Sequence, residues 1–489
     1  MLNLVMLNFS PVIYWTDGFV YGLLFVFGSW GFLTRHAPQM QTLKNKILSR
    51  PRYLASVIIL AFFGLVGLLD TLHFTTETLK PKVMSVLDVI MSPVGQNNEE
   101  TYSAPFATRS FVPEFVKNES GQLLEIYPKL EYAGTHLQGN QFKQNKSLDI
   151  LTRVWKGMFQ GILVTLLFYM LFRRKISRMF SGVLQSGKSV TINTASPEST
   201  SAVSASPETA SPETASPETA YMKTLSLKSI SLSASVWITL GILSCFVCVC
   251  LNLMQEYHIL GTDKVGRDVF YMAIKSIRTG LVIGILTTLV MLPFALILGM
   301  WAGYFSGIID DLIQYVYITL SSIPAVLLIA AAVLSFQLKI EGNPDLKLLL
   351  LCLILGITSW TSLCRLLRGE SLVLRDSEFV QAAITLGVSH FTIIRRHIFP
   401  NLMHIVIITL VLDFSGLVLS EAVLTYVGVG VDASTYSFGN MINAARLEMV
   451  RDPMVWWSLV GSFTLMFALV FSANIFSEAV QQAMNPRNE

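Results

Sequence analysis

Residues Gly182 to Ser189 read GVLQSGKS and match the P-loop pattern G-x-x-x-x-G-K-[ST] letter by letter. In a P-loop, backbone N–H groups cradle the phosphates of ATP, the lysine reaches the phosphates, and the last hydroxyl contacts magnesium. Such a loop joins a buried strand to a helix whose N-terminus faces the phosphates. Here a basic segment precedes the pattern and VTINTASPEST follows it, so we expect neither element. The sequence therefore argues against ATP hydrolysis by this chain, which we expect not to be an enzyme.

Four acidic residues, Asp17, Asp70, Asp413 and Glu421, lie within or near long apolar runs. Charged groups are costly inside a membrane, so each is a candidate for function. Asp413 and Glu421 are eight residues apart, close to one face of a helix, and we expect them either to line a translocation path or to pair within a helix bundle. For Asp17 and Asp70 we expect packing roles or positions near the surface. A secondary transporter or channel that uses such acids is the alternative function.

A polar and basic stretch, EFVQAAITLGVSHFTIIRRHIFPN, separates two long apolar runs at Glu378 to Asn401. The residues that fall on one helical face are Val380, Ile384, Gly387, Phe391, Ile394 and Ile398. Gly387 can adopt the left-handed conformation that ends a helix, Ser389 can cap a second helix, and Pro400 sits where a third would begin. The pattern predicts a helix, a sharp turn and a second helix that lie along a membrane surface.

This stretch resembles the EAA loop, the cytoplasmic loop of ATP-binding-cassette (ABC) importer permeases. The family pattern is Glu-Ala-Ala, three residues, Gly, nine residues, and Ile-x-Leu-Pro. Gly387 and Pro400 keep this spacing, whereas Gln381, His397 and Phe399 replace the family's Glu, Ile and Leu. The resemblance implies a coupling element that docks in a groove of a separate ATPase subunit and has no chemistry of its own. The alternative is an ordinary basic loop that obeys the positive-inside rule.

From this resemblance we expect the coupling loop to include Glu378, Val380, Gln381, Ala382, Ala383, Ile384, Gly387, Phe391 and Pro400. The contact itself is expected at Gly387 and along Val380, Ile384 and Phe391.

Three further segments are similar to dipeptide, oligopeptide and nickel permeases. They are GTDKVGRDVFYMAIKSIRTGLVIG from Gly261, GMWAGYFSGIIDDLI with SSIPAVLLIA between 299 and 330, and the loop from Leu419 to Ile442. Asp263 and Asp268 are expected to cap helices or to pair with Arg267 at the outer interface. The resemblance covers about residues 225–489.

The composition is that of an integral membrane protein, because 52% of the 489 residues are hydrophobic and only 14% are charged. All five cysteines lie in apolar segments, so neither a disulfide nor a metal site is indicated. Apolar runs long enough to span a membrane occur near 12–33, 53–73, 156–172, 235–256, 279–302, 312–336, 347–366, 402–428 and 456–478. Pro324 predicts a kink inside one of them.

The loops rich in lysine and arginine fix the expected orientation, because such loops stay in the cytoplasm. They carry Arg35, Lys44, Lys46, Arg50 and Arg52; Arg173, Arg174, Lys175 and Arg178; and Arg365, Arg368, Arg375, Arg395 and Arg396. All three groups lie on one side only if the N-terminus is outside and the C-terminus is inside. The fold class expected is therefore an all-α membrane protein with about nine transmembrane helices, a six-helix permease core and a three-helix N-terminal extension.

The chain divides into five expected regions. These are a pair of transmembrane helices at 1–75, an extracytoplasmic loop domain at 76–155, a third transmembrane helix at 156–175, a disordered cytoplasmic linker at 176–224, and the permease core at 225–489. The linker is assigned because SPETA occurs three times in succession from Ser206 to Ala220, and repeated Pro, Ser, Thr and Glu cannot bury apolar surface.

The resemblance implies a permease subunit of an ABC importer in the bacterial inner membrane, with di- or oligopeptides as the favoured cargo. It also implies the partners: a second homologous permease subunit, two ATPase subunits that hydrolyse ATP, and an extracytoplasmic substrate-binding protein. We expect no cofactor or metal bound by this chain and no nucleic-acid partner.

Overall fold

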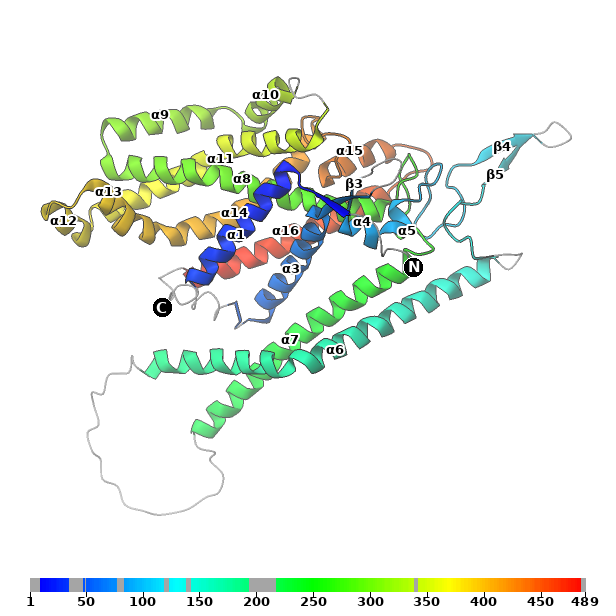
Figure 1. Cartoon of the computed structure of the whole chain (residues 1–489), viewed down its shortest axis with the longest axis horizontal. Coiled ribbons are helices and arrows are strands. Elements are labelled where there is room, and N and C mark those ends of the chain that lie inside the picture. Colours follow the sequence, from blue (N-terminus) through cyan, green and yellow to red (C-terminus); the bar gives the residue numbers. More distant parts are fainter. Residues whose placement is uncertain are drawn as a thin grey trace, which may run out of the picture.

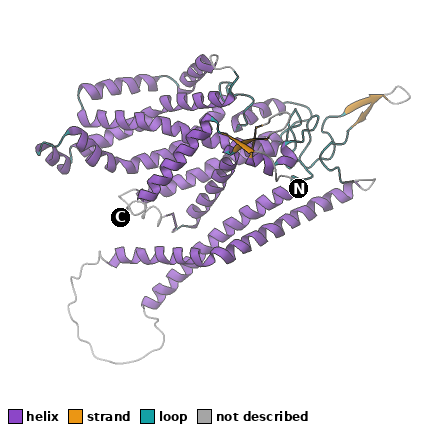
Figure 2. Cartoon of the chain, viewed as in Figure 1, coloured by secondary structure: helices purple, strands orange, loops and turns teal. Residues whose placement is uncertain are grey.

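The structure is a computed structural model that describes residues 9–34, 47–48, 50–76, 83–117, 123–137, 142–192, 217–337 and 342–484. Long helices dominate it, and the strands are short and gathered at one end (Figure 1 and Figure 2). The long helices are α1 (Trp15–Thr34), α3 (Pro51–Thr71), α6 (Phe142–Ile192), α7 (Pro217–Leu253), α8 (Val269–Phe305), α9 (Ile308–Ser322), α10 (Ala325–Gln337), α11 (Pro344–Arg375), α14 (Phe399–Tyr426) and α16 (Trp457–Met484). The shorter helices are α4 (Val86–Ile90), α5 (Ser92–Gly95), α12 (Glu378–Thr385), α13 (His390–Ile393), a π-helix (Ile394–Ile398) and α15 (Phe438–Glu448).

Seven of the described helices are long and apolar enough to cross a membrane, or eight if α9 and α10 form one bent span. The seven are α3, α6, α7, α8, α11, α14 and α16, and each overlaps most of one of the predicted apolar runs. The predicted run at 12–33 corresponds to α1. The count of nine spans stays a prediction.

The predicted span at 312–336 is not one straight helix. Helices α9 and α10 meet at 88°, far more than the kink expected from Pro324. Ile323, before the proline, has extended backbone angles of φ −90° and ψ 131°. A residue before proline is driven out of the helical region, so α9 ends there and α10 starts in a new direction.

The expectation of an all-α fold is wrong in the N-terminal part of the chain. Strands β1 (Phe9–Val12), β2 (His73–Thr76) and β3 (Val83–Ser85) form an antiparallel sheet in that order, and β4 (Glu114–Lys117) pairs with β5 (Leu123–Ile126) as a hairpin. β1 enters α1 and β2 leaves α3 at the same end of these helices (Figure 1). Strand pairing satisfies backbone groups that the helices no longer satisfy.

The predicted linker at 176–224 is too wide. The backbone is helical at 176–192, as the end of α6, and at 217–224, as the start of α7, whereas 193–216 lie outside the described residues. Apolar residues continue at helical spacing beyond the third predicted span, at Ile176, Met179, Phe180 and Val183, which favours extension of the helix.

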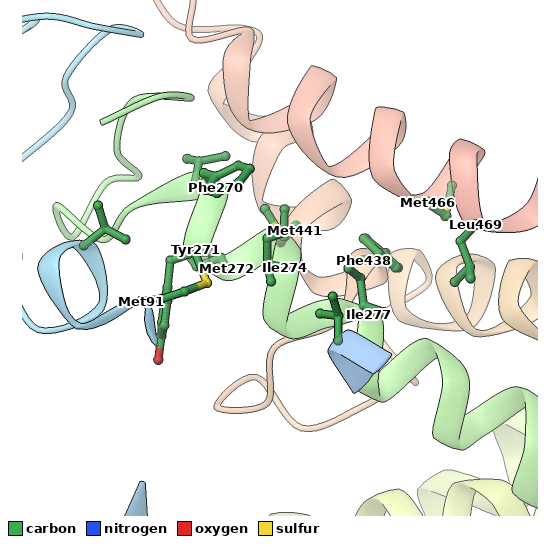
Figure 3. Close-up of a cluster of buried hydrophobic side chains, with 14 of the residues drawn as sticks. Met91, Phe270, Tyr271, Met272, Ile274, Ile277, Phe438, Met441, Met466 and Leu469 are labelled. Atoms are coloured by element: carbon green, nitrogen blue, oxygen red, sulfur yellow. The ribbon is translucent and has the colours of Figure 1, made fainter. Parts of the chain in front are cut away.

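Helices α8 and α11 form the centre of the bundle, and two glycines bring their backbones together. A Cβ atom at Gly303 would lie 2.5 Å from the carbonyl oxygen of Arg368, and one at Gly299 would lie 2.9 Å from that of Cys364. Small residues at such a seam let transmembrane helices approach closely. The first turns of α8 are also enclosed (Figure 3), because Phe438 and Met441 of α15 and Met466 and Leu469 of α16 cover them.

Helices α6 and α7 form a hairpin beside the bundle (Figure 1). They also meet at glycines, since a Cβ at Gly161 would lie 2.5 Å from Cys245 Cα and one at Gly157 would lie 2.6 Å from Val249 Cα. Within this chain only 11% of the α6 span and 6% of the α7 span is buried. The hairpin meets the bundle mainly where α7 packs against α3, with Leu54 of α3 next to Leu232 and Val236 of α7, and most of the remaining surface of its two spans is exposed.

The bundle has two distinct ends (Figure 1). One carries α12 and α13 and is called the loop end here. The other carries α15, the two small sheets and the segment 83–134, and is called the outer end. Long helices connect the two ends, so a movement of the loop end reaches the outer end through these helices.

Candidate functional site

The polar stretch at the loop end begins as predicted, with the short helix α12 and a tight turn at Gly387. The second helix is not a separate short one, because the chain is helical without a break from His390 through the π-helix into α14. Gly387 has φ +73°, and its N–H donates to Ile384 O at 3.0 Å while the N–H of Val388 donates to Ala383 O at 3.1 Å. This pair of bonds is a Schellman motif, which satisfies the last carbonyls of α12. Ser389 occupies the N-cap position of α13, and Pro400 lies in the first turn of α14. The predicted turn at Gly387 is confirmed, whereas the Ser389 side chain makes no capping hydrogen bond and the helix passes Pro400 without a break.

One face of this loop is buried in the bundle. Val380 is 0% exposed and Ala383 is 7% exposed, and both belong to a core cluster with Ile393, Ile394 and Ile398. The expected contact stripe is therefore wrong at Val380, which supports the loop from beneath and is not accessible to another protein. The helical face counted from the sequence is mostly the inward face, as amphipathic helices require.

The opposite face of the loop is exposed and apolar at its tip. Leu386 is 82% exposed and Phe391 is 73% exposed, and Gly387 between them has nothing within 4 Å of the place where a Cβ would lie. Glu378, Gln381 and Ala382 are also exposed, whereas Ile384 is half-buried. Phe391, which was predicted to contact the ATPase subunit, lies on this exposed face. Leu386 was missed because it lies off the counted stripe, although its place beside the turn glycine is a usable signal.

Polar contacts fix the loop to α8 and α11. The Tyr304 hydroxyl and His390 Nδ1 share a hydrogen bond of 2.7 Å, and Gln381 Nε2 donates to Arg375 O at 3.0 Å. Arg368 donates from Nε and Nη2 to the two oxygens of Asp310, at 2.5 and 2.7 Å, and so ties α9 to α11. The loop therefore sits on a rigid base, and its exposed tip cannot move without these helices.

The two acidic residues of α14 occupy different surroundings. Glu421 is 1% exposed, and its carboxylate accepts hydrogen bonds from Thr425 Oγ1 at 2.9 Å, from Ser437 and from the N–H of Gly439. It thus holds the N-terminus of α15, which favours the bundle-pairing alternative for this residue. Asp413 is half-buried, and no hydrogen bond to its carboxylate occurs among the described residues. A role of Asp413 in a translocation path stays a prediction.

At the outer end, the aspartates before α8 do what the sequence predicted. Asp268 caps α8, because its Oδ1 accepts the N–H of Tyr271 at 2.7 Å. Asp263 Oδ2 pairs with Arg267 Nη2 at 3.0 Å, and its Oδ1 accepts two backbone N–H groups of the same turn. Both residues are structural in this chain.

His258 joins this turn to the segment 83–134. Its Nδ1 lies 2.7 Å from Asp268 Oδ2 and its Nε2 lies 3.4 Å from Glu99 Oε1. Glu99 also accepts the N–H groups of Glu131, Tyr132 and Ala133. Burial would lower the pKa of His258, but the hydrogen bonds to Asp268 and Glu99 raise it to about 9. The imidazolium is therefore charged at neutral pH and bridges two buried carboxylates.

The N-terminal helices are fastened to α8 by ion pairs. Arg278 Nη2 lies 2.5 Å from Asp17 Oδ1, and Lys275 Nζ lies 3.2 Å from Asp70 Oδ1 and 2.7 Å from Asp88 Oδ1. The packing role expected for Asp17 and Asp70 agrees with these contacts.

The P-loop-like residues Gly182 to Ser189 lie within α6, and their backbone is helical throughout. A helix cannot wrap its N–H groups around a phosphate in the way that a P-loop does.

Comparison with known proteins gives one family and a group of relatives. Residues 295–489 match the family described as "Binding-protein-dependent transport system inner membrane component". The oligopeptide transport system permease protein OppC of Haemophilus influenzae is 30% identical over 235 residues, which cover 48% of this chain and 72% of that protein.

Two other relatives are named for different substrates. The dipeptide transport system permease protein DppC of Bacillus subtilis is 28% identical over 47% of this chain and 69% of its own length. The glutathione transport system permease protein GsiD of Pectobacterium atrosepticum is 29% identical over 47% of this chain and 73% of its own length.

Proposed function

Because this chain belongs to the binding-protein-dependent transport permeases, the multi-pass inner-membrane components of ABC importers, we propose that it forms half of a peptide-translocating pore. It is a transporter subunit of the oligopeptide, dipeptide and glutathione permease type and not an enzyme. Its cargo in this proposal is a di- or oligopeptide. A second homologous permease subunit forms the other half of the pore, and an extracytoplasmic substrate-binding protein delivers the peptide.

The observation that carries the proposal is the exposed tip of the loop 378–401. Leu386 and Phe391 are 82% and 73% exposed around a turn glycine, on a base fixed to α8 and α11. Monomeric surfaces seldom keep large apolar side chains together unless a partner covers them. We assign this tip to one of two ATPase subunits that hydrolyse ATP, so that their closure moves α8 and α11 and switches the access of the pore.

The orientation and span count belong to the same proposal. Arg375 ends α11 and Arg395 lies in the π-helix, both next to α12 and α13 at the loop end. Arg52, at the start of α3, pairs at 2.8 Å with Glu478 of α16, whose C-terminal end points toward the same side of the bundle (Figure 1). By the positive-inside rule this end is cytoplasmic, so the segment 83–134 lies outside the cytoplasm. With α1 and the bent pair α9 and α10 as spans, the total is nine.

The test is peptide-stimulated ATP hydrolysis by the chain reconstituted with its partner permease, candidate ATPase subunits and binding protein. Leu386→Glu places a charge in the proposed contact without filling any buried space, and we expect at least a tenfold loss of stimulated hydrolysis. Leu123→Glu is the matched control, because Leu123 is 64% exposed on β5 at the outer end. We expect the control to hydrolyse ATP as the wild type does.

Wild-type hydrolysis by Leu386→Glu in an assembled complex would show that the tip is not the coupling contact. The same preparation also distinguishes an ABC importer from a secondary transporter, the alternative function. A secondary transporter would move peptide along a proton or ion gradient without ATP.

A further inference from the structure

A pocket of about 290 Å³ opens at the outer end, away from the coupling loop. It lies between the turn that precedes α8, the loop before α15, and α15 itself, and Asp263, Lys264, Ser437, Asn443 and Glu448 are among its lining residues. Small-ligand pockets in proteins begin at about 300 Å³. The pocket is therefore at the lower end of this size range, which suits one small polar molecule.

The pocket wall holds a buried carboxylate with an unsatisfied oxygen. Glu448 is 4% exposed, and its Oε2 has no hydrogen-bond partner among the described residues; the same holds for the buried Oδ1 of Asn443. The Glu448 carboxylate accepts a hydrogen bond from Tyr102, which belongs to the segment 83–134. A buried polar atom without a partner costs about 1 to 3 kcal/mol, and more when it is charged. Each of these two acceptors lacks a donor that a ligand can supply.

The ligand group that fits these acceptors is an ammonium. A carboxylate oxygen accepts most strongly from a charged donor, so an ammonium is favoured over a neutral donor at Glu448. The charged neighbours of Glu448 are Asp263, Lys264 and Arg451. An ammonium offers three donors, enough for Glu448 Oε2 and Asn443 Oδ1 with one to spare. Among the described residues no group of three His, Cys, Asp or Glu side chains could hold a metal ion.

The rim of the pocket has the opposite charge. Lys264 is exposed and forms no salt bridge among the described residues, and Arg267 is paired on one side only, with Asp263. These cations would repel a lysine side chain of a protein partner but would attract a carboxylate. A ligand with an ammonium at one end and a carboxylate at the other matches both the wall and the rim.

We propose that this pocket binds a short peptide on the outer side of the permease, with its free amino terminus at Glu448 and Asn443 and its carboxylate toward Lys264. The assignment rests on the proposed function, because it makes the pocket an entry site for the same class of cargo. It also gives the segment 83–134 a role, since Tyr102 orients the carboxylate that receives the amino terminus.

The test is equilibrium binding of radiolabelled trialanine to the full chain in nanodiscs without binding protein or ATPase subunits. We expect saturable binding to the wild type and at least a tenfold weaker affinity for Glu448→Gln, which keeps the size of the side chain and an acceptor for Tyr102. Glu125→Gln, a change of the same kind on exposed β5, is the matched control and should bind as the wild type does.

The ligand can be changed instead of the protein, which avoids any effect on folding. N-acetyl-trialanine lacks the ammonium, and we expect at least a tenfold loss of affinity. Trialanine amide lacks only the carboxylate and faces an exposed lysine, so a loss of about two- to fivefold is expected, from the weak pairing of exposed charges. Equal binding of trialanine and its N-acetyl form, equal binding by Glu448→Gln, or no saturable binding to the wild type would each overturn the proposal.

The binding experiment tests the pocket separately from the proposed contact between the loop tip and an ATPase subunit. Trialanine binding that depends on Glu448, together with ATP hydrolysis indifferent to Leu386→Glu, would refute the coupling role alone. Transport that responds to Leu386→Glu in a chain that does not bind trialanine would refute the pocket alone.

Discussion

The two ends of this bundle differ in which side chains they bury. The outer end pairs its charged side chains within the chain, and the loop end exposes large apolar side chains. At the outer end, Lys275, Arg278 and His258 are each paired with carboxylates from the N-terminal half of the chain. At the loop end, the tip presents Leu386 and Phe391 to the exterior. The outer end holds its buried cations by contacts within the chain, whereas the coupling proposed for the loop end assigns its apolar tip to a second protein.

The ion pairs at the outer end show how the N-terminal helices stabilise the core helix α8. Lys275 and Arg278 lie in the second and third turns of α8, and their side chains are only 13% exposed, so burial makes an unpaired positive charge costly there. Asp17, Asp70 and Asp88 come from α1, α3 and α4 and neutralise these two cations. The extension is therefore part of the folded core at this end and not a separate attachment.

The largest effect expected from this comparison is at Gly266. This residue has φ +74°, and a Cβ atom would lie 1.7 Å from Glu99 O, so Gly266→Ala must push the segment 83–134 away from the turn. We expect a loss of about 4 kcal/mol or more in the free energy of local opening. Amide hydrogen exchange of residues 99–134 measures it.

Gly307→Ala at the loop end is the matched control, because Gly307 has φ +63° but nothing within 4 Å of a Cβ. Only backbone strain of about 1 kcal/mol is expected there. Equal costs at the two glycines would contradict the difference in packing between the ends.

The second-largest effect expected is that the stability of the outer end, but not of the loop end, depends on pH. His258 has an ordinary pKa of 6.5 in the unfolded chain and about 9 when folded, so its contribution is complete below pH 6.5 and is lost as the pH rises through 9. That difference corresponds to about 3 kcal/mol. We expect proteolysis of the segment 83–134 to become faster between pH 6.5 and pH 9.5 while cleavage near α12 and α13 does not.

His258→Gln should remove this dependence on pH, because glutamine can donate a hydrogen bond to one of the two carboxylates but does not titrate. A pH profile that survives in His258→Gln would place its origin elsewhere.

The smallest effect is expected for the ion pair at the loop end. Arg52 and Glu478 lie 2.8 Å apart, but their side chains are 54% and 44% exposed. Exposed pairs of this kind contribute little because water and salt screen them. We expect Glu478→Gln to leave the melting temperature of the purified chain unchanged within error, and a shift of several degrees would show that this end is also held by charge.

The sequence predicted the parts of this fold that depend on local rules. The turn at Gly387 and the helix start after Ser389 follow from backbone preferences of single residues, and the structure confirms both. The helix start predicted at Pro400 is wrong, because the helix that begins at His390 passes the proline without a break. The apolar runs located seven helices for the same reason, because a membrane span must be long and apolar.

Features that depend on distant contacts were not predictable in this way. The sequence could not show that Val380 faces the bundle, since an amphipathic stripe does not say whether it meets the chain's own core or a partner. Nor could it pair His258 with Glu99 or Tyr102 with Glu448, because these residues are brought together by the packing of the segment 83–134 on the core. The strands β1 and β2 were missed because each is only four residues long and their pairing joins segments far apart in the chain.

The central claim is that one end of this permease is closed by its own chain and the other is completed by an ATPase subunit. Amide hydrogen exchange of the full chain, with and without candidate ATPase subunits, tests both halves at once. We predict that exchange around Leu386 to Phe391 slows at least tenfold when the ATPase subunits are added, while exchange at residues 99–134 does not change. Unchanged exchange at the loop in an assembled complex, or protection at the outer end instead, would contradict the account.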